Sequence, residues 1–207
     1  MKKIILIPLL FLFTIQFNAQ EMELLVGRNF TTYDYTNSDG ESNPNLEGAS
    51  GSYIEVSYNV PFKNRNQNFY YSLGLTLNQF NATGGDYVSN YSWDTNYLGI
   101  KSGLKYFFTN SSSFIKAAAK TGFGINRIIN GQQKINGATF DLTNEEEFTA
   151  VSVQPYIGLE LKYEVTSGIL IGVGYNYSKS FAVANGDEEN LNFNNSRFEF
   201  GITVPVN

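Results

Sequence analysis

The chain has 207 residues and contains neither cysteine nor histidine, with 14 Lys and Arg against 19 Asp and Glu. The absence of both residue types excludes disulfides, thiol chemistry, thiolate or imidazole metal ligands, and every mechanism that needs a histidine base. The formal charge of −5 and the lack of a basic patch argue against binding to nucleic acid.

The first predicted element is a cleavable signal peptide over residues 1–19. Lys2 and Lys3 form a positively charged start, an uncharged and mostly apolar run follows over residues 4–17, and Ala19 supplies a small residue for cleavage. The alternative is an anchor helix, but the run is shorter than the ~20 residues that a membrane-spanning helix needs. No later stretch reaches ~18 uninterrupted apolar residues, so a membrane segment after residue 19 would have to be a closed β-barrel.

Eight segments of alternating polar and apolar residues follow. Each predicts a β-strand, because a helical pattern would repeat every 3.6 residues instead of every two. The clearest runs from Tyr71 to Asn78, where large apolar residues alternate with small or polar ones. Arg28 interrupts the apolar face of the first strand, which predicts a bulge or register shift there. Pro155 predicts a similar irregularity in the sixth strand, because proline has no N–H to donate to the ladder. The other seven segments cover about 22–33, 51–60, 98–108, 115–126, 151–162, 169–178 and 197–204.

The connections between these strands alternate in length. The short ones cover 61–68, 109–113 and 164–168, and the long ones cover 34–50, 81–92, 129–148 and 181–195. Short turns at one end and longer loops at the other are typical of outer-membrane barrels, and an even strand number places both termini at the short-turn, periplasmic end. Within the third long connection, Asn130-Gly131 and Asn136-Gly137 are turn signals that predict a hairpin above the membrane.

With these features, residues 21 to 207 resemble the eight-stranded outer-membrane barrels of the OmpA and OmpX type, a group also described as porin family proteins. The resemblance includes the closing strand from Arg197 to Val204, which is similar to the family's C-terminal insertion signal but is followed by Pro205-Val206-Asn207 instead of an aromatic end. It implies an all-β, eight-stranded, antiparallel up-and-down transmembrane barrel over residues 20–207. It also implies a monomer in contact with the lipid of a bacterial outer membrane.

The polar faces of the strands distinguish this barrel from its soluble alternatives, a lipocalin-like barrel or a β-sandwich. A soluble exterior would favour Lys, Glu and Thr, because glycine weakens a strand, whereas small residues suit a narrow lumen. The large Leu, Ile, Val, Phe and Tyr residues on the opposite face fit contact with lipid. The polar-face glycines are Gly74, Gly99, Gly103, Gly122, Gly124, Gly158, Gly172, Gly174 and Gly201.

Aromatic residues near the strand ends predict two girdles at the membrane interfaces. Toward the short turns lie Tyr70, Tyr71, Tyr106, Phe107, Phe108, Phe114 and Tyr163, and toward the long loops lie Tyr33, Tyr53, Trp93, Tyr97, Tyr175 and Phe198.

The polar face also carries charged residues, which the barrel would place in its lumen. Buried charges persist when they are paired, so the pattern predicts an ion network, with a contact between Lys116 and Glu160. Because side chains just fill the interior of an eight-stranded barrel, we expect this network to plug the lumen, and the alternative is a narrow pore. The predicted members are Glu55, Lys101, Lys105, Lys116, Lys120, Glu160, Lys162, Arg197 and Glu199.

The long connections are acidic, and Glu145–Glu147 is one of their short charged runs. No calcium-binding loop with the required spacing is present, so we predict neither a metal site nor a cofactor. Without histidine, the Ser–His chemistry of barrel enzymes is excluded, and we predict no catalytic residue. The leading hypothesis is a non-catalytic barrel with a structural or anchoring role, whose acidic loops contact an extracellular partner. The alternatives are a narrow, porin-like pore and a soluble periplasmic binder of lipophilic ligands.

Overall fold

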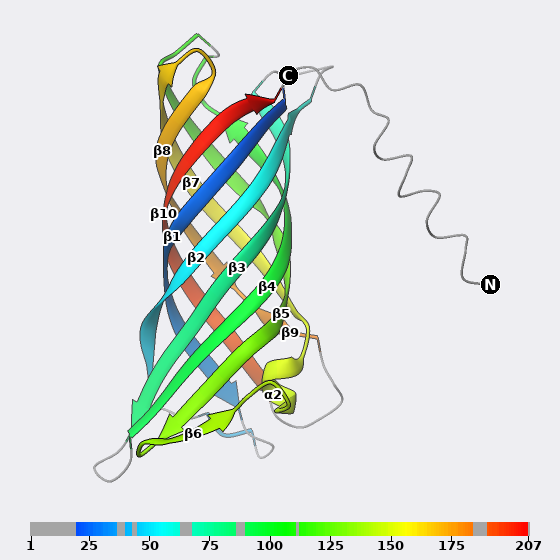
Figure 1. The fold of residues 1–207 in the computed structure, drawn as a ribbon. Helices are drawn as coiled ribbons and strands as arrows, with labels where there is room; N and C mark the ends of the chain where they lie inside the picture. Colours follow the sequence, from blue (N-terminus) through cyan, green and yellow to red (C-terminus); the bar gives the residue numbers. More distant parts are fainter. Residues whose placement is uncertain are drawn as a thin grey trace, which may run out of the picture.

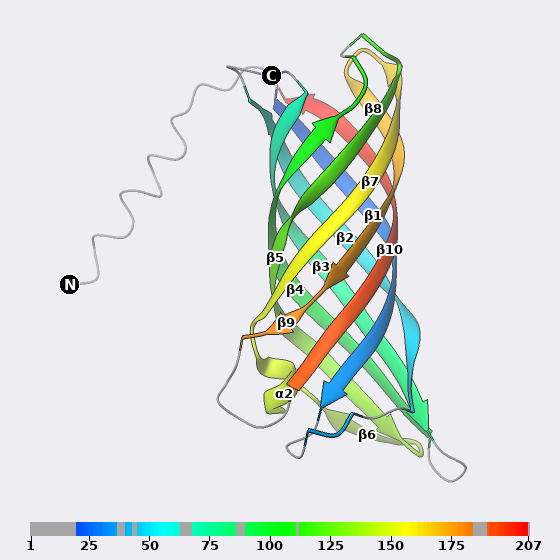
Figure 2. The same cartoon turned by 180° about the vertical axis from the view of Figure 1, so that it is seen from behind.

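The computed structural model describes residues 20–36, 40–42, 45–62, 68–85, 90–110, 112–183 and 190–206. Eight long antiparallel strands form a closed ring, in which neighbours along the chain pair and the last strand returns to the first (Figures 1 and 2). The prediction of an eight-stranded up-and-down barrel is therefore confirmed. The ring strands are β1 (Gln20–Thr36), β2 (Leu46–Pro61), β3 (Phe69–Gly85), β4 (Asn90–Phe107), β5 (Ile115–Ile135), β7 (Ser152–Thr166), β8 (Ile169–Lys179) and β10 (Asn190–Val206).

Three short elements lie at the end of the barrel opposite the start of β1. They are strand β6 (Ala138–Asp141), the single helical turn α2 (Glu146–Thr149) and strand β9 (Phe181–Ala182) (Figure 1). Strand β6 pairs with the end of β5 through a tight turn, in which Asn136 and Gly137 have φ angles of 49° and 90°. These are left-handed conformations that Asn and Gly adopt most readily, so the predicted turn signal at this dipeptide is confirmed. The turn predicted at Asn130-Gly131 is wrong, because both residues lie within β5 and pair with β4.

Alternation along each strand sets one face outward and the other inward. On β3 the outward residues from Phe69 to Leu77 are all large and apolar, and Leu75 is 61% exposed. Beyond them the outward face becomes polar at Gln79 and Asn81. We call the apolar zone around the barrel the lipid belt, since such a surface is stable against hydrocarbon and not against water.

The strands continue well past the lipid belt. Ladder pairing between β3 and β4 reaches Gly85 and Asn90, and β5 runs on to Ile135. The predicted loops over 81–92 and 129–148 are thus largely strand, and those boundaries were wrong. The apolar pattern ends where lipid ends, but the hydrogen-bond ladder does not need an apolar outer face to continue.

The structure corrects the predicted irregularity at Arg28, which pairs in regular register with Ser52 on one side and Phe198 on the other. Arg28 is exposed on the outer face, beside an aromatic group in which Phe198 lies 6.2 Å from Phe30 and 5.1 Å from Tyr175 between ring centroids. This level is the loop-side edge of the lipid belt, where a long cationic side chain can extend to the interface.

Pro155 also sits in a regular strand, opposite Phe123 of β5. On its other side, pairing with β8 starts at Tyr156, and pairing with β9 covers Ser152 and Val153. The proline, which has no N–H to donate, therefore falls in the gap between two ladders, and no bulge is needed to accommodate it.

No helix among the described ranges is long and apolar enough to cross a membrane.

Glycine is required where the inner wall has no space for a side chain. A Cβ on Gly103 would collide with the Tyr156 hydroxyl and would lie 2.5 Å from the Thr121 carbonyl oxygen. We expect Gly103→Ala to lower the free energy of unfolding by ~1–3 kcal/mol through overpacking. Urea unfolding in lipid vesicles measures this change. Gly124→Ala is the matched control, because its Cβ would meet no atom closer than 3.6 Å, and an equal loss in both variants would contradict the packing argument.

Candidate functional site

The short-turn half of the lumen is organised around two carboxylates. Glu23 accepts hydrogen bonds from Lys105 at 2.9 Å and from Lys162 at 2.5 Å, one on each oxygen. Glu160 lies 3.0 Å from Lys105 and 3.3 Å from Lys162, measured from carboxylate oxygen to Nζ. Each lysine is thus shared between two carboxylates, and all four side chains are buried.

A second set of charges continues the network toward the loop end. Glu199 pairs with Lys120 at 2.5 Å and with the Nε of Arg197 at 2.6 Å. Lys120 also lies 3.8 Å from Glu160, which joins the two sets.

Aromatic rings separate these groups from the next ion pair. The Arg197 guanidinium lies 3.5 Å from the centre of the Tyr53 ring, and the Tyr53 hydroxyl donates a short hydrogen bond to Glu55. Glu55 pairs with Lys101 at 2.8 Å, and the Lys101 ammonium lies 4.2 Å from the centre of the Tyr156 ring. Two small spaces bordered by these described groups measure about 10 Å³ each, which is no more than one water needs.

The structure brings eight of the nine predicted lumen residues together in the buried interior: Glu55, Lys101, Lys105, Lys120, Glu160, Lys162, Arg197 and Glu199. Lys116 lies instead at the short-turn rim, where it is partly exposed and 3.7 Å from Glu164. The predicted Lys116–Glu160 contact is wrong, because the β5–β7 register sets Ala118 opposite Glu160. That register depends on the path of the connection over residues 129–148. The alternation of polar and apolar residues does not predict this path.

Glu23 is the principal lumen residue that the sequence-based prediction missed. The signal for it was present, since Met22, Leu24 and Val26 form an outward apolar row and the residues between them must face inward.

Above the ion network, four buried rings close the lumen. We call them the aromatic plug: Tyr33, Phe80, Tyr97 and Phe193. Phe193 lies at the centre, with its ring 4.9, 5.0 and 5.6 Å from those of Tyr33, Phe80 and Tyr97 respectively. The Tyr33 hydroxyl donates to the Phe80 carbonyl oxygen at 2.9 Å, which anchors the plug to the wall.

The aromatic plug corrects part of the predicted girdles. Tyr33, Tyr53 and Tyr97 point into the barrel instead of toward lipid. Trp93 packs against Tyr33, and at the short-turn end Tyr70 packs against the buried Phe107. Tyr33, between the outward Thr32 and Asp34, lies where the outer face is already polar, and Tyr97, between Asn96 and Leu98, lies at the edge of the lipid belt. Strand alternation turns both side chains inward, where the lumen buries their rings. The sequence pattern predicted correctly where these residues lie along their strands. It did not predict whether lipid or water surrounds the barrel at that level.

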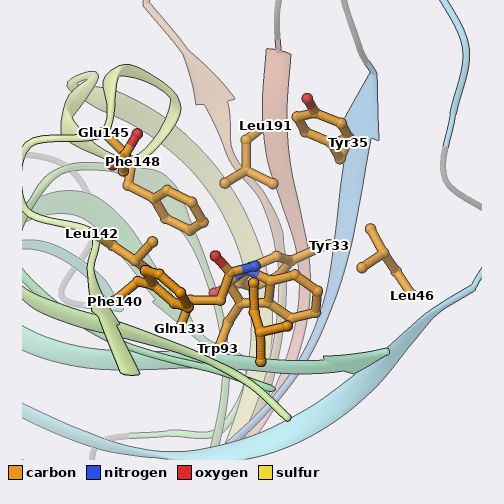
Figure 3. Close-up of a pocket in the computed structure, with 11 residues that line it drawn as sticks. Tyr33, Tyr35, Leu46, Trp93, Gln133, Phe140, Leu142, Glu145, Phe148 and Leu191 are labelled. Carbon is orange, nitrogen blue, oxygen red and sulfur yellow. The ribbon is translucent and has the colours of Figure 1, made fainter. Parts of the chain in front are cut away.

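A cavity of about 400 Å³ opens above the aromatic plug, at the mouth of the barrel. We call it the mouth pocket. Its walls come from β1, β2, β4 and β10, from the β5–β6 hairpin, and from α2 with the segment that precedes it (Figure 3). It is lined by Tyr33, Tyr35, Leu46, Trp93, Gln133, Ile135, Phe140, Leu142, Glu145, Phe148 and Leu191.

The surroundings of the mouth pocket are acidic but hold no cluster of metal ligands in the part of the chain that the structure describes. The backbone N–H and hydroxyl of Thr143 donate to Asp141 at 2.8 and 2.7 Å. These bonds lower the pKa of the exposed Asp141 carboxyl below its usual value, so it stays negatively charged.

A closed ring of antiparallel strands with an apolar outer belt and a charged, filled lumen defines a transmembrane β-barrel. The family model described as outer membrane protein beta-barrel domain matches residues 4–203, and the chain belongs to this family. Its location is the bacterial outer membrane. Comparison with curated proteins gives no match.

Several solved structures are similar in fold. Neisserial surface protein A is 14% identical, with a TM-score of 0.43, 88% of this chain covered and 97% of that one. Ail, the attachment invasion locus protein of Yersinia pestis, is 12% identical, with a TM-score of 0.40 and coverages of 90% and 99%. The outer membrane enzyme PagL is 9% identical, with a TM-score of 0.38 and coverages of 86% and 99%. None of these values is high enough to carry an activity from those proteins to this chain.

Proposed function

We propose that this protein is a non-catalytic, non-conducting outer-membrane barrel, which acts as a structural or anchoring element and presents an extended wall outside the membrane. The observation that carries the proposal is the filled lumen. The ion network and the aromatic plug follow one another along the barrel axis, and each is built from buried side chains of several strands.

The filled lumen favours a non-conducting barrel over a narrow pore. An ion crossing the barrel would have to displace paired charges that are held by two or three partners each, and then the stacked rings of the aromatic plug. Breaking buried pairs and then entering an apolar layer are both costly for an ion.

The chemistry of the chain supports a non-catalytic role. The sequence contains no histidine or cysteine, so a barrel hydrolase that uses a histidine base or a cysteine nucleophile is excluded. The second predicted alternative, a soluble periplasmic binder, does not fit the outer-membrane location, nor an outer surface on which Leu75, Ile157 and Phe198 are about 60% exposed.

The extension of the strands beyond the lipid belt supports a role for the outer end in contacting a partner. The β5–β6 hairpin and α2 form part of this end, and the exposed acidic side chains here include Asp141 in the hairpin and Glu145 just before α2. The predicted signal peptide over residues 1–19 and parts of the acidic connections, among them residues 37–39, 86–89 and 184–189, lie outside the described residues. Export through that signal is part of the proposal.

Planar-bilayer recording of the purified full chain tests the proposal. We expect no stepwise conductance, because the ion network and the aromatic plug block the axis. Insertion is verified on the same preparation by a heated-versus-unheated gel shift, which reports the folded barrel. Reproducible, ion-selective conductance steps from the unaltered protein would overturn the non-conducting role.

A further inference from the structure

The mouth pocket lies outside the membrane, at a level where the outer wall is polar. Next to the lining residues Tyr33 and Trp93, the outward positions are held by Asp34 and Asp94. A ligand would therefore reach the pocket from the extracellular water instead of from lipid.

The pocket is blind and largely preformed. Tyr33 contributes both to its floor and to the aromatic plug, and its hydroxyl is held by the Phe80 carbonyl oxygen and by Thr95 at 3.1 Å. On the opposite side, the Tyr97 hydroxyl donates to the Phe148 carbonyl oxygen at 3.3 Å, which ties α2 to the plug. A ligand can bind here without passing through the barrel. A volume of about 400 Å³ falls in the range of small-molecule sites.

Among the residues that the structure describes, the lining is aromatic and carries negative charge only. Five of these eleven lining residues are aromatic, Glu145 is the one carboxylic acid among them, and none of them is Lys or Arg. The Tyr33 ring centre lies 6.2 Å from that of Trp93 and 6.3 Å from that of Phe148, with tilts of 46° and 54°. These rings lie together among the lining side chains (Figure 3), and the face of an aromatic ring attracts a cation.

The nearest basic residues do not offset this charge. Lys134 is on the opposite face of the hairpin from the lining residues Gln133 and Ile135. Lys179 is already paired with Asp34, at 3.6 Å.

From the aromatic lining, the single carboxylate and the blind floor, we propose that the mouth pocket binds a small organic cation with an apolar body, such as a quaternary ammonium or a protonated aromatic amine. This goes beyond the proposed function and does not depend on it, since the pocket sits above the lumen. A conductance result would leave the binding proposal unchanged, and a binding result would leave the conductance proposal unchanged.

The chain supplies its own reporter for this site. Trp93 lines the pocket and is the single tryptophan in the sequence, so its fluorescence reports on the pocket alone. Three probes share one ring and differ in charge: benzyltrimethylammonium, benzyl alcohol and phenylacetate. In the detergent-solubilised full chain, we expect saturable quenching by benzyltrimethylammonium, at least fivefold weaker binding of benzyl alcohol, and no saturable binding of phenylacetate.

Variants assign the binding to the pocket. Phe140→Ala removes a lining ring that is 49% exposed, so the barrel is expected to fold normally while affinity for benzyltrimethylammonium falls at least fivefold. Glu145→Gln should reduce the preference for the cation over benzyl alcohol. Phe181→Ala is the matched control, because Phe181 is equally exposed at the same end but does not line the pocket. A gel shift on heating verifies that each variant is folded.

Three results would overturn the proposal: no saturable quenching by the cation, equal binding of phenylacetate, or unchanged binding by Phe140→Ala. Equal binding of the cation and benzyl alcohol, with no effect of Glu145→Gln, would contradict the cation preference.

Discussion

The variant Glu23→Gln is expected to lower the free energy of unfolding by roughly 3–5 kcal/mol, the cost of breaking a buried ion pair from one side. Glu23 is buried and binds Lys105 and Lys162 at the same time. Without its charge, Glu160 is the one remaining carboxylate that both lysines contact among the described residues. The small space beside Glu160 and Lys162 measures about 10 Å³, so water can replace few of the lost contacts.

Urea unfolding of the barrel in lipid vesicles, followed by the gel shift on heating, measures this loss. The control is Glu164→Gln, which removes the pair with Lys116 at the rim, where both side chains are partly exposed. There we expect a change below ~1 kcal/mol, as is usual for solvated pairs. Similar losses in both variants would contradict a special role for the buried network.

The double variant Glu23→Gln, Lys162→Gln tests whether the loss of stability comes from the broken ion pair or from altered packing. Since it removes one charge of each sign, the net charge of the lumen stays as it is in the unaltered protein. We expect the double variant to be more stable than Glu23→Gln alone. If it were less stable by the sum of both single losses, the two residues would contribute independently and the network interpretation would fail.

The second large effect is expected on the lipid face, from Leu73→Arg. Leu73 is 48% exposed in the middle of the apolar run on β3, so an arginine there would face hydrocarbon near the centre of the lipid belt. The expected loss is ~2–4 kcal/mol, because a charge near the bilayer midplane must be partly dehydrated.

Thr83→Arg is the matched control for this variant. Thr83 is on the same strand and the same outward face, but it lies past the lipid belt, beyond Gln79 and Asn81. We expect its effect to stay within ~0.5 kcal/mol, as for other surface changes. The same vesicle unfolding assay compares the two, and equal tolerance of both arginines would contradict the placement of the belt.

The position of Arg28 agrees with the same dependence of arginine's cost on depth in the bilayer. The sequence pattern suggested that this arginine would need a bulge to avoid lipid, and the structure shows regular pairing instead. Its level at the edge of the belt resolves the conflict, because an arginine is tolerated near the interface and not at the centre. The level of a residue in the bilayer follows from how the strands are staggered, which a single strand's pattern does not contain.

Much of the lumen was predictable because a strand repeats every two residues. Once Leu75 and its neighbours are assigned to lipid, the alternate residues must face inward, and the same argument applied to β1 predicts Glu23 inside. The partners of each charge were not predictable. They depend on the register between β5 and β7, which is set by a long connection and by side-chain packing inside the ring.

The sequence by itself determined the strands, their number, and which residues share a face, because these properties are local and follow from backbone geometry. Only the tertiary structure decided at which level along the barrel axis each residue lies, and therefore which aromatic residues contact lipid and which pack together inside the lumen. On β10, Phe198 and Phe200 point outward within the lipid belt, whereas Phe193 points inward above it. The physical reason is the surrounding medium: where water replaces lipid outside the wall, the interior becomes the only apolar environment, and the aromatic plug and the mouth pocket form there.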